Sequence, residues 1–258
     1  QRTRRLILEA LEPRQLLAAF TWTGGGGDDD WSNALNWDGP AGEIPDDGTD
    51  DITLNVDDTI VLNKALTIGD ITLEDDETDI DLNGNNLTVD NVTVEGGAAV
   101  GNVLNIINNR AAATLTTANI SVEGDAHDAR FEISGGVTLA GDSVTVGGNA
   151  DNEFRVEGGG IATVDSIDAG GPGFDSMATG SIHVEGDGST LTVNGNIRLG
   201  TAGGEGDLFV NNKGTLIVDT IQAGQSDGGN SRRGFVTVGA GATMAATLQA
   251  AGIGSGDD

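Results

Sequence analysis

The feature that most constrains the fold is a recurring pair of apolar residues separated by one intervening position. Three series of such pairs follow one another along the chain in constant order. Each pair is the in-out-in alternation of a strand with one buried face. The last five steps of the first series, counted on the second residue of each pair, are 27, 23, 28, 26 and 28 residues. That series comprises Ile52/Leu54, Ile80/Leu82, Leu104/Ile106, Phe131/Ile133, Phe154/Val156, Ile182/Val184, Leu208/Val210 and Val236/Val238.

The other two series occupy the rest of each repeat. The second contains Leu87/Val89, Val137/Leu139, Leu191/Val193, Leu216/Val218 and Met244/Ala246. The third contains Val92/Val94, Ile120/Val122, Val144/Val146, Ile167/Ala169, Ile197/Leu199, Ile221/Ala223 and Leu248/Ala250. The segments are rich in Thr and Val and are separated by Gly, Asn and Asp turn signals.

Three short strands per repeat predict an all-β fold, a parallel β-helix (β-solenoid) of about eight coils that fills residues 51–258, with a short helical segment at the N-terminus. Because each coil is one supersecondary unit, neighbouring coils would bury a continuous aliphatic core. An up-and-down barrel also has short strands, but it would not keep three series in constant order. We therefore prefer the solenoid.

The charge balance excludes one class of partner. The chain has 41 Asp and Glu against 12 Lys and Arg, a net charge of −29. This charge repels phosphate backbones, so we expect no nucleic-acid binding. The absence of Cys excludes disulfides and zinc-thiolate sites. No apolar run is long enough to span a membrane, so we expect that the chain is not membrane-spanning.

A short motif near the N-terminus concerns the destination of the protein. Leu11-Glu12-Pro13-Arg14-Gln15-Leu16-Leu17 resembles the LEPR-XLL motif, which lies near the N-terminus of surface or secreted proteins of planctomycetes and some marine bacteria. The resemblance implies an extracellular or cell-surface location. We assign residues 1–20 to an N-terminal segment for export, sorting or assembly. The structural alternative is a short amphipathic helix broken near Pro13.

The next segment, residues 21–50, contains all three Trp of the chain, Trp22, Trp31 and Trp37. The string Thr21-Trp22-Thr23-Gly24-Gly25 and the later Asn36-Trp37 resemble the opening of autotransporter-type surface β-helices. Terminal coils of repeat proteins need a cap, so we interpret this segment as a cap that closes one end of the core. The alternative is a platform on which sugar rings stack.

One acidic string has the spacing of a calcium loop. Asp79, Asp81, Asn83 and Asp90 match the pattern D-x-D-x-N-G-x5-D, which resembles an EF-hand-like loop and raises calcium as a candidate ligand. Ile80 and Leu82 also form a core pair, which would direct Asp79 and Asp81 outward from a strand. The sequence establishes no cofactor beyond this calcium candidate.

Enzymatic residues are few. One outward column reads Glu132, Arg155, His183, Phe209 and Thr237, and it predicts a surface ion pair between Glu132 and Arg155. Two neighbouring carboxylates are the groups that glycoside hydrolysis requires. The chain has only two His, however, and the pattern supplies neither with a partner set. The sequence therefore predicts a protein that is not an enzyme, with a polysaccharide lyase or hydrolase as the alternative.

These patterns favour an extracellular structural β-solenoid, an adhesive cell-surface or fibre-forming module. The chain ends at Asp258 without a capping sequence, so we expect head-to-tail assembly through the last coil, or further coils of a longer chain. The expected partners are thus further copies or coils, or a surface polysaccharide. The alternative function is a carbohydrate-binding or carbohydrate-cleaving β-helix module.

Overall fold

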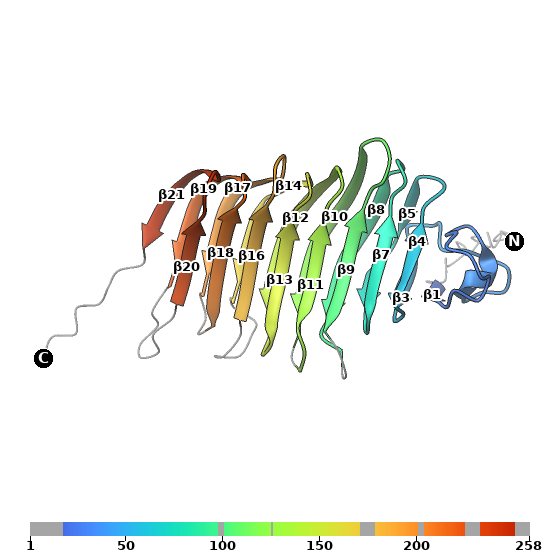
Figure 1. Cartoon of the computed structure of the whole chain (residues 1–258). Coiled ribbons are helices and arrows are strands. Elements are labelled where there is room, and N and C mark those ends of the chain that lie inside the picture. Colours follow the sequence, from blue (N-terminus) through green and yellow to red (C-terminus); the bar gives the residue numbers. More distant parts are fainter. Residues whose placement is uncertain are drawn as a thin grey trace, which may run out of the picture.

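The computed structural model describes residues 18–97, 101–124, 126–170, 179–200, 204–224 and 233–250. Parallel strands stack along one axis from the N-terminal to the C-terminal end (Figure 1). This arrangement confirms the predicted all-β solenoid. The predicted N-terminal helical segment and the motif residues Leu11, Glu12, Pro13, Arg14, Leu16 and Leu17 lie outside the described residues.

One side of the solenoid is a parallel sheet that, within the described residues, has eight strands. Its strands carry the first apolar series, and each pairs with the equivalent strand of the next coil. They are β4 (Asp58–Val61), β7 (Glu77–Asp81), β9 (Asn102–Ile107), β11 (Ala129–Ile133), β13 (Asp151–Val156), β16 (Thr179–Glu185), β18 (Glu205–Asn211) and β20 (Arg233–Val238).

The second and third series lie together in one sheet, which has thirteen strands among the described residues. β8 shows why, because Leu87/Val89 and Val92/Val94 lie in a single strand. At the corner, Asp90 N–H still donates to Gly69 O at 3.0 Å. In β8 the sheet therefore bends without interrupting its hydrogen bonds, whereas on other coils the same corner divides β5 (Leu66–Ile68) from β6 (Ile71–Leu73) and β14 (Ile161–Val164) from β15 (Ser166–Ala169).

The strands of this sheet are β1 (Ala18–Trp22), β2 (Trp37–Asp38), β3 (Asp50–Leu54), β5 (Leu66–Ile68), β6 (Ile71–Leu73), β8 (Leu87–Glu95), β10 (Ala113–Glu123), β12 (Val137–Gly147), β14 (Ile161–Val164), β15 (Ser166–Ala169), β17 (Thr190–Leu199), β19 (Thr215–Ala223) and β21 (Thr243–Ala250). A single 3₁₀ turn, η1 (Ala34–Asn36), precedes β2. No helix among the described residues is long and apolar enough to cross a membrane.

The structure corrects two details of the predicted repeat. Ile52/Leu54 does not open the first series, because β3 pairs with β6 in the thirteen-stranded sheet. The first series starts at β4 instead, where Ile60 lies beside Ile80. The number of complete turns is about six, slightly fewer than the eight predicted. Six strands of the eight-stranded sheet have a neighbour on both sides, and β4 and β20 end it.

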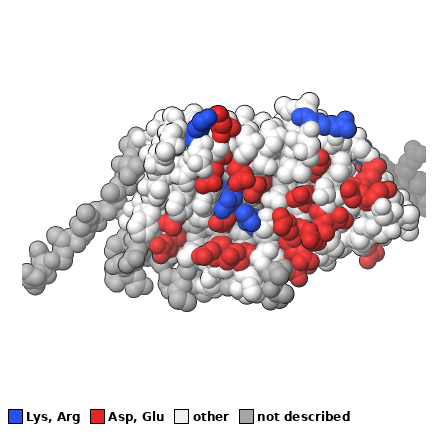
Figure 2. Space-filling view, viewed as in Figure 1, with Lys and Arg blue, Asp and Glu red and all other residues white. Residues whose placement is uncertain are grey.

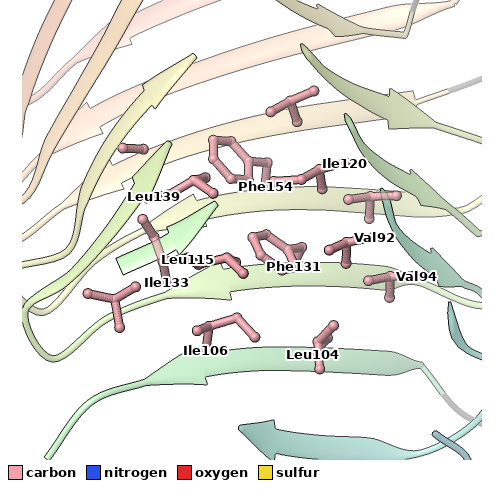
Figure 3. Packing of buried hydrophobic residues seen from close by; sticks show 14 of the residues in the cluster. Val92, Val94, Leu104, Ile106, Leu115, Ile120, Phe131, Ile133, Leu139 and Phe154 are labelled. Carbon is pink, nitrogen blue, oxygen red and sulfur yellow. The ribbon is translucent and has the colours of Figure 1, made fainter. Parts of the chain in front are cut away.

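The core between the two sheets is a stack of aliphatic ladders (Figure 3). Phe131 and Phe154 form its aromatic step and are fully buried. Leu104 precedes Phe131 in the same column, and Ile182 follows Phe154. Burying one such side chain stabilises the fold by about 1.5–3 kcal/mol. This regular column keeps the intervening residues of β11, β13 and β16 on the outer face.

The N-terminal end of the core contains the three Trp. Trp37 packs edge-on against Trp22 and Trp31, with ring centroids 4.9 and 4.8 Å apart, and all three are buried. Their indole N–H groups are also satisfied. Trp22 donates to Asp58 at 2.8 Å, Trp31 to Pro45 O at 2.9 Å, and Trp37 to Trp31 O at 2.8 Å. β1, which begins at Ala18, pairs in parallel with β3 and so belongs to this end of the sheet.

Candidate functional site

The candidate site lies on the outer face of the eight-stranded sheet, over β11, β13, β16 and β18. Acidic residues gather on this face around a small group of basic ones (Figure 2). Strand alternation places them there, because each core residue is flanked by residues that point outward. One outward column contains Arg130, Glu153, Ser181 and Asp207, and the next contains Glu132, Arg155, His183 and Phe209.

Arg155 lies at the centre of the ion pairs on this face. Its Nε is 2.8 Å from Glu153 Oε2, and its Nη1 is 3.6 Å from Glu157 Oε2. The predicted ion pair with Glu132 is therefore wrong. The guanidinium extends along its own strand to Glu153 instead of across to the preceding coil. Because these side chains remain partly exposed, each ion pair contributes only about 0–1 kcal/mol.

Two carboxyl groups beside Arg155 have opposite pKa shifts. Burial, with repulsion from Glu157, raises the pKa of Glu132 to about 7. Burial also opposes ionisation of Glu153, but the hydrogen bond and charge of Arg155 outweigh it and lower the pKa of Glu153. Near pH 7, a partly protonated Glu132 on β11 is thus paired in register with Arg155, which binds an ionised Glu153.

His183 extends the cluster toward β18. Its ring stacks on Phe209, with centroids 4.7 Å apart and 24° between the planes. Its Nε2 lies 3.2 Å from Ser181 Oγ and 3.7 Å from Glu153 Oε1. Burial lowers the pKa of His183, Glu153 and Glu185 oppose this shift, and Arg155 reinforces it. The imidazole is therefore mostly neutral at pH 7.

A hollow of about 460 Å³ opens beside this histidine. Phe209 lines it together with the small residues Gly180 and Ser181. Asp207 also lines it, with an Oδ1 that is buried and has no hydrogen-bond partner among the described residues. Burial and the charge of Glu205 raise the pKa of Asp207. The hollow thus combines an aromatic face with hydrogen-bonding groups.

A second hollow, of about 400 Å³, lies on the other side of Glu153. Arg130 and Arg155 line it, and Asp151 and Glu153 line both hollows. Such a combination can bind a polyhydroxylated ligand and can hold a proton donor and an acceptor beside it. Glu153, Ser181 and Asp207 were not among the residues predicted from the sequence. They form an outward column two residues before the one that contains Arg155, so extending the same alternation would have found them.

The candidate calcium residues are distributed over two sheets. Asp79 and Asp81 lie on β7, Asn83 lies in the turn that follows, and Asp90 lies on β8. Asp79 Oδ1 accepts from Asn105 at 2.8 Å, and Asp81 Oδ1 accepts from Asn83 N–H at 2.8 Å. Within the described residues, no three His, Cys, Asp or Glu side chains form a group that could hold a metal ion.

The remaining predicted residues are the cap residues. Trp22, Trp31 and Trp37 come together in the N-terminal cluster, whereas the LEPR-XLL residues fall outside the described part of the chain.

In comparisons with protein-family models, curated proteins and solved structures, nothing matches this chain.

Proposed function

We propose that this chain is an extracellular structural β-solenoid, a stiff module of a cell surface or a fibre. The observation that carries the proposal is the continuous parallel pairing of both sheets along one axis. Bending such a rod strains every ladder of hydrogen bonds and the aliphatic stack inside it. The extracellular location rests on the resemblance of residues 11–17 to the LEPR-XLL motif. The high negative charge supports solubility outside the cell.

In this proposal, copies stack end to end along the solenoid axis, because parallel strands at the end of a sheet offer backbone groups for pairing. Electron microscopy and light scattering of the full chain over a concentration series test the assembly. We expect rods longer than one chain, which shorten at low concentration. A chain that stays monomeric at every concentration contradicts assembly, and a compact, flexible particle contradicts the stiff rod.

A second candidate function is carbohydrate binding, and the hollow beside His183 favours it. The stacked pair of His183 and Phe209 provides an apolar face for a sugar ring, while Glu153 and Ser181 provide hydrogen-bonding groups. Near pH 7, Glu132 is partly protonated and Glu153 is ionised. A glycosidase requires one carboxyl group in each of these states. The chain would then bind or cleave a surface polysaccharide.

Titration calorimetry with neutral oligosaccharides of glucose and of N-acetylglucosamine tests this second candidate. We expect binding by the native chain and its loss in Phe209→Ala, with Leu35→Ala, an exposed apolar residue at the N-terminal end, as the control. Product analysis with Glu132→Gln then separates cleavage from binding. Equal heats of binding for the native chain and the Phe209→Ala variant would show that the hollow does not bind the sugar.

A further inference from the structure

A second outward face has a different chemistry from the charged one. It is formed by the first half of the long strands in the thirteen-stranded sheet, and it consists of two columns. The first column is Thr114, Thr138, Ile161, Thr190, Thr215 and Thr243. The second is Thr67, Thr88, Thr116, Ala140, Thr163, Thr192, Ile217 and Ala245. We call these fourteen residues the threonine face.

The threonine face is free of charge although the chain is not. Charged residues make up 21% of the sequence, a share that would place about three charges among fourteen positions. None is present, and ten of the fourteen are Thr. Charges resume at the neighbouring corner, where Asp90, Asp142, Asp165 and Asp219 are exposed. The high β-propensity of Thr explains Thr on any strand, but it does not explain why acids are confined to the borders.

The hydroxyls of this face are available to the surroundings. Among the described residues, none of the ten Thr side chains makes a hydrogen bond, and all fourteen positions are partly or fully exposed. The buried Thr78 and Thr117 do form such bonds, whereas the half-buried Thr93 and Thr145 form none within the described part of the chain. Thr78 Oγ1 donates to Val56 O at 2.7 Å, and Thr117 Oγ1 donates to Asp90 O at 3.2 Å. The threonine face therefore presents unused donors and acceptors to its surroundings.

The spacing of these groups is periodic in two directions. Neighbouring strands lie about 4.8 Å apart, and two residues along a strand span about 6.7 Å. The hydroxyls and methyls thus form a regular array about 34 Å long, whose two columns lie about 6.7 Å apart. These regular spacings match a rigid, periodic ligand better than a single small molecule, because the groups are spread over a surface and do not converge on one point.

We propose that the threonine face adsorbs to ice. In ice every water molecule both donates and accepts hydrogen bonds in a neutral lattice, and a Thr hydroxyl does the same. The methyl groups leave the bound water free to order, whereas a charged group would hold it in a hydration shell. The two alternatives fit less well. A second copy would cover an array of only about 230 Å², against the roughly 800 Å² per partner of a stable interface. A polysaccharide would find no aromatic ring and no carboxylate or guanidinium there.

An ice-affinity experiment with the full chain tests the proposal. Ice is grown slowly from a dilute solution, and the protein concentration is measured in the ice and in the remaining liquid. We expect the native chain to concentrate in the ice and to slow the recrystallisation of small ice grains. Thr116→Lys with Thr192→Lys should abolish both effects, because each Lys lies in the middle of the array.

The matched control is Thr93→Lys with Thr145→Lys, on the other half of β8 and β12. This face carries the charged pair Asp168 and Arg198, so the control should adsorb to ice as the native chain does. Equal urea midpoints establish that both variants fold. Exclusion of the native chain from ice overturns the proposal, as does equal incorporation of the Thr116/Thr192 variant. Co-sedimentation with crystalline cellulose or chitin, combined with exclusion from ice, would assign the face to a neutral polysaccharide instead.

Discussion

The rings of Phe131 and Phe154 stack on adjacent coils, with centroids 6.1 Å apart and 11° between their planes. Phe154→Ala removes one of the two stacked rings. It leaves a cavity in the core, because the hydrogen-bonded strands around it cannot move in to fill the space. We expect it to lower the free energy of unfolding by about 3–5 kcal/mol. Urea denaturation measures the change. Phe209→Ala, on the outer face of β18, is the matched control and should cost much less.

The Trp cluster at the N-terminal end leads to a prediction about local stability. Trp37→Ala removes the ring that contacts both Trp22 and Trp31, at a cost of about 3–5 kcal/mol. In a solenoid each coil contacts only its neighbours, so the loss should remain near that end. Hydrogen exchange should accelerate in β3 and β6 before it changes in β16 and β18. Leu35→Ala is the control, because Leu35 is 73% exposed; uniform acceleration along the chain would contradict a local cap.

The alternation of apolar residues was sufficient to predict the solenoid, because a period of two fixes which side chains enter the core. It was not sufficient to tell the three sides of a coil apart. Ile52/Leu54 has the same local pattern as Ile60/Leu62, and only its hydrogen bonding to β6 shows that it belongs to the thirteen-stranded sheet. The bend at Asp90 was also not predictable, since the sheet turns there without losing its ladder.

The sequence predicted which outward-facing residues of the candidate site are neighbours, but not which of their side chains are in contact. Alternation places Glu132 and Arg155 next to each other on adjacent strands. The side-chain rotamer then decides whether Arg155 reaches Glu132 or Glu153. The order of residues in a column does not determine that rotamer. The hollow beside His183 depends on the same choice, together with the small size of Gly180 and Ser181.

The shifted pKa of Glu132 makes stability depend on pH. This pKa is about 7 in the folded chain, against 4.5 for an ordinary Glu. The folded state therefore binds more protons between these values, and the contribution of Glu132 to stability falls as pH rises from about 4.5 through about 7. His183 acts in the opposite direction, because its lowered pKa costs stability as pH falls below its ordinary value of 6.5.

Glu132→Gln isolates the first of these effects. Gln stays neutral, so the urea midpoint of the variant relative to the native chain should be higher at pH 8 than at pH 5. Glu43→Gln, which removes one exposed carboxylate from the N-terminal region, is the control for the loss of a charge. The same relative midpoint at both pH values would mean that Glu132 is ionised throughout.

Salt provides the last prediction, because it separates general screening from calcium binding. With a net charge of −29, the folded chain repels itself, and NaCl should raise its unfolding midpoint. A calcium site formed by Asp79, Asp81, Asn83 and Asp90 requires a further rise in CaCl₂ at equal ionic strength. Asp79→Asn with Asp81→Asn should then remove the excess, while Asp142→Asn with Asp219→Asn, which removes the same charge elsewhere, should retain it. Equal midpoints in CaCl₂ and in NaCl would leave the four residues as an ordinary strand and turn, in which Asp79 and Asp81 accept hydrogen bonds from Asn105 and Asn83.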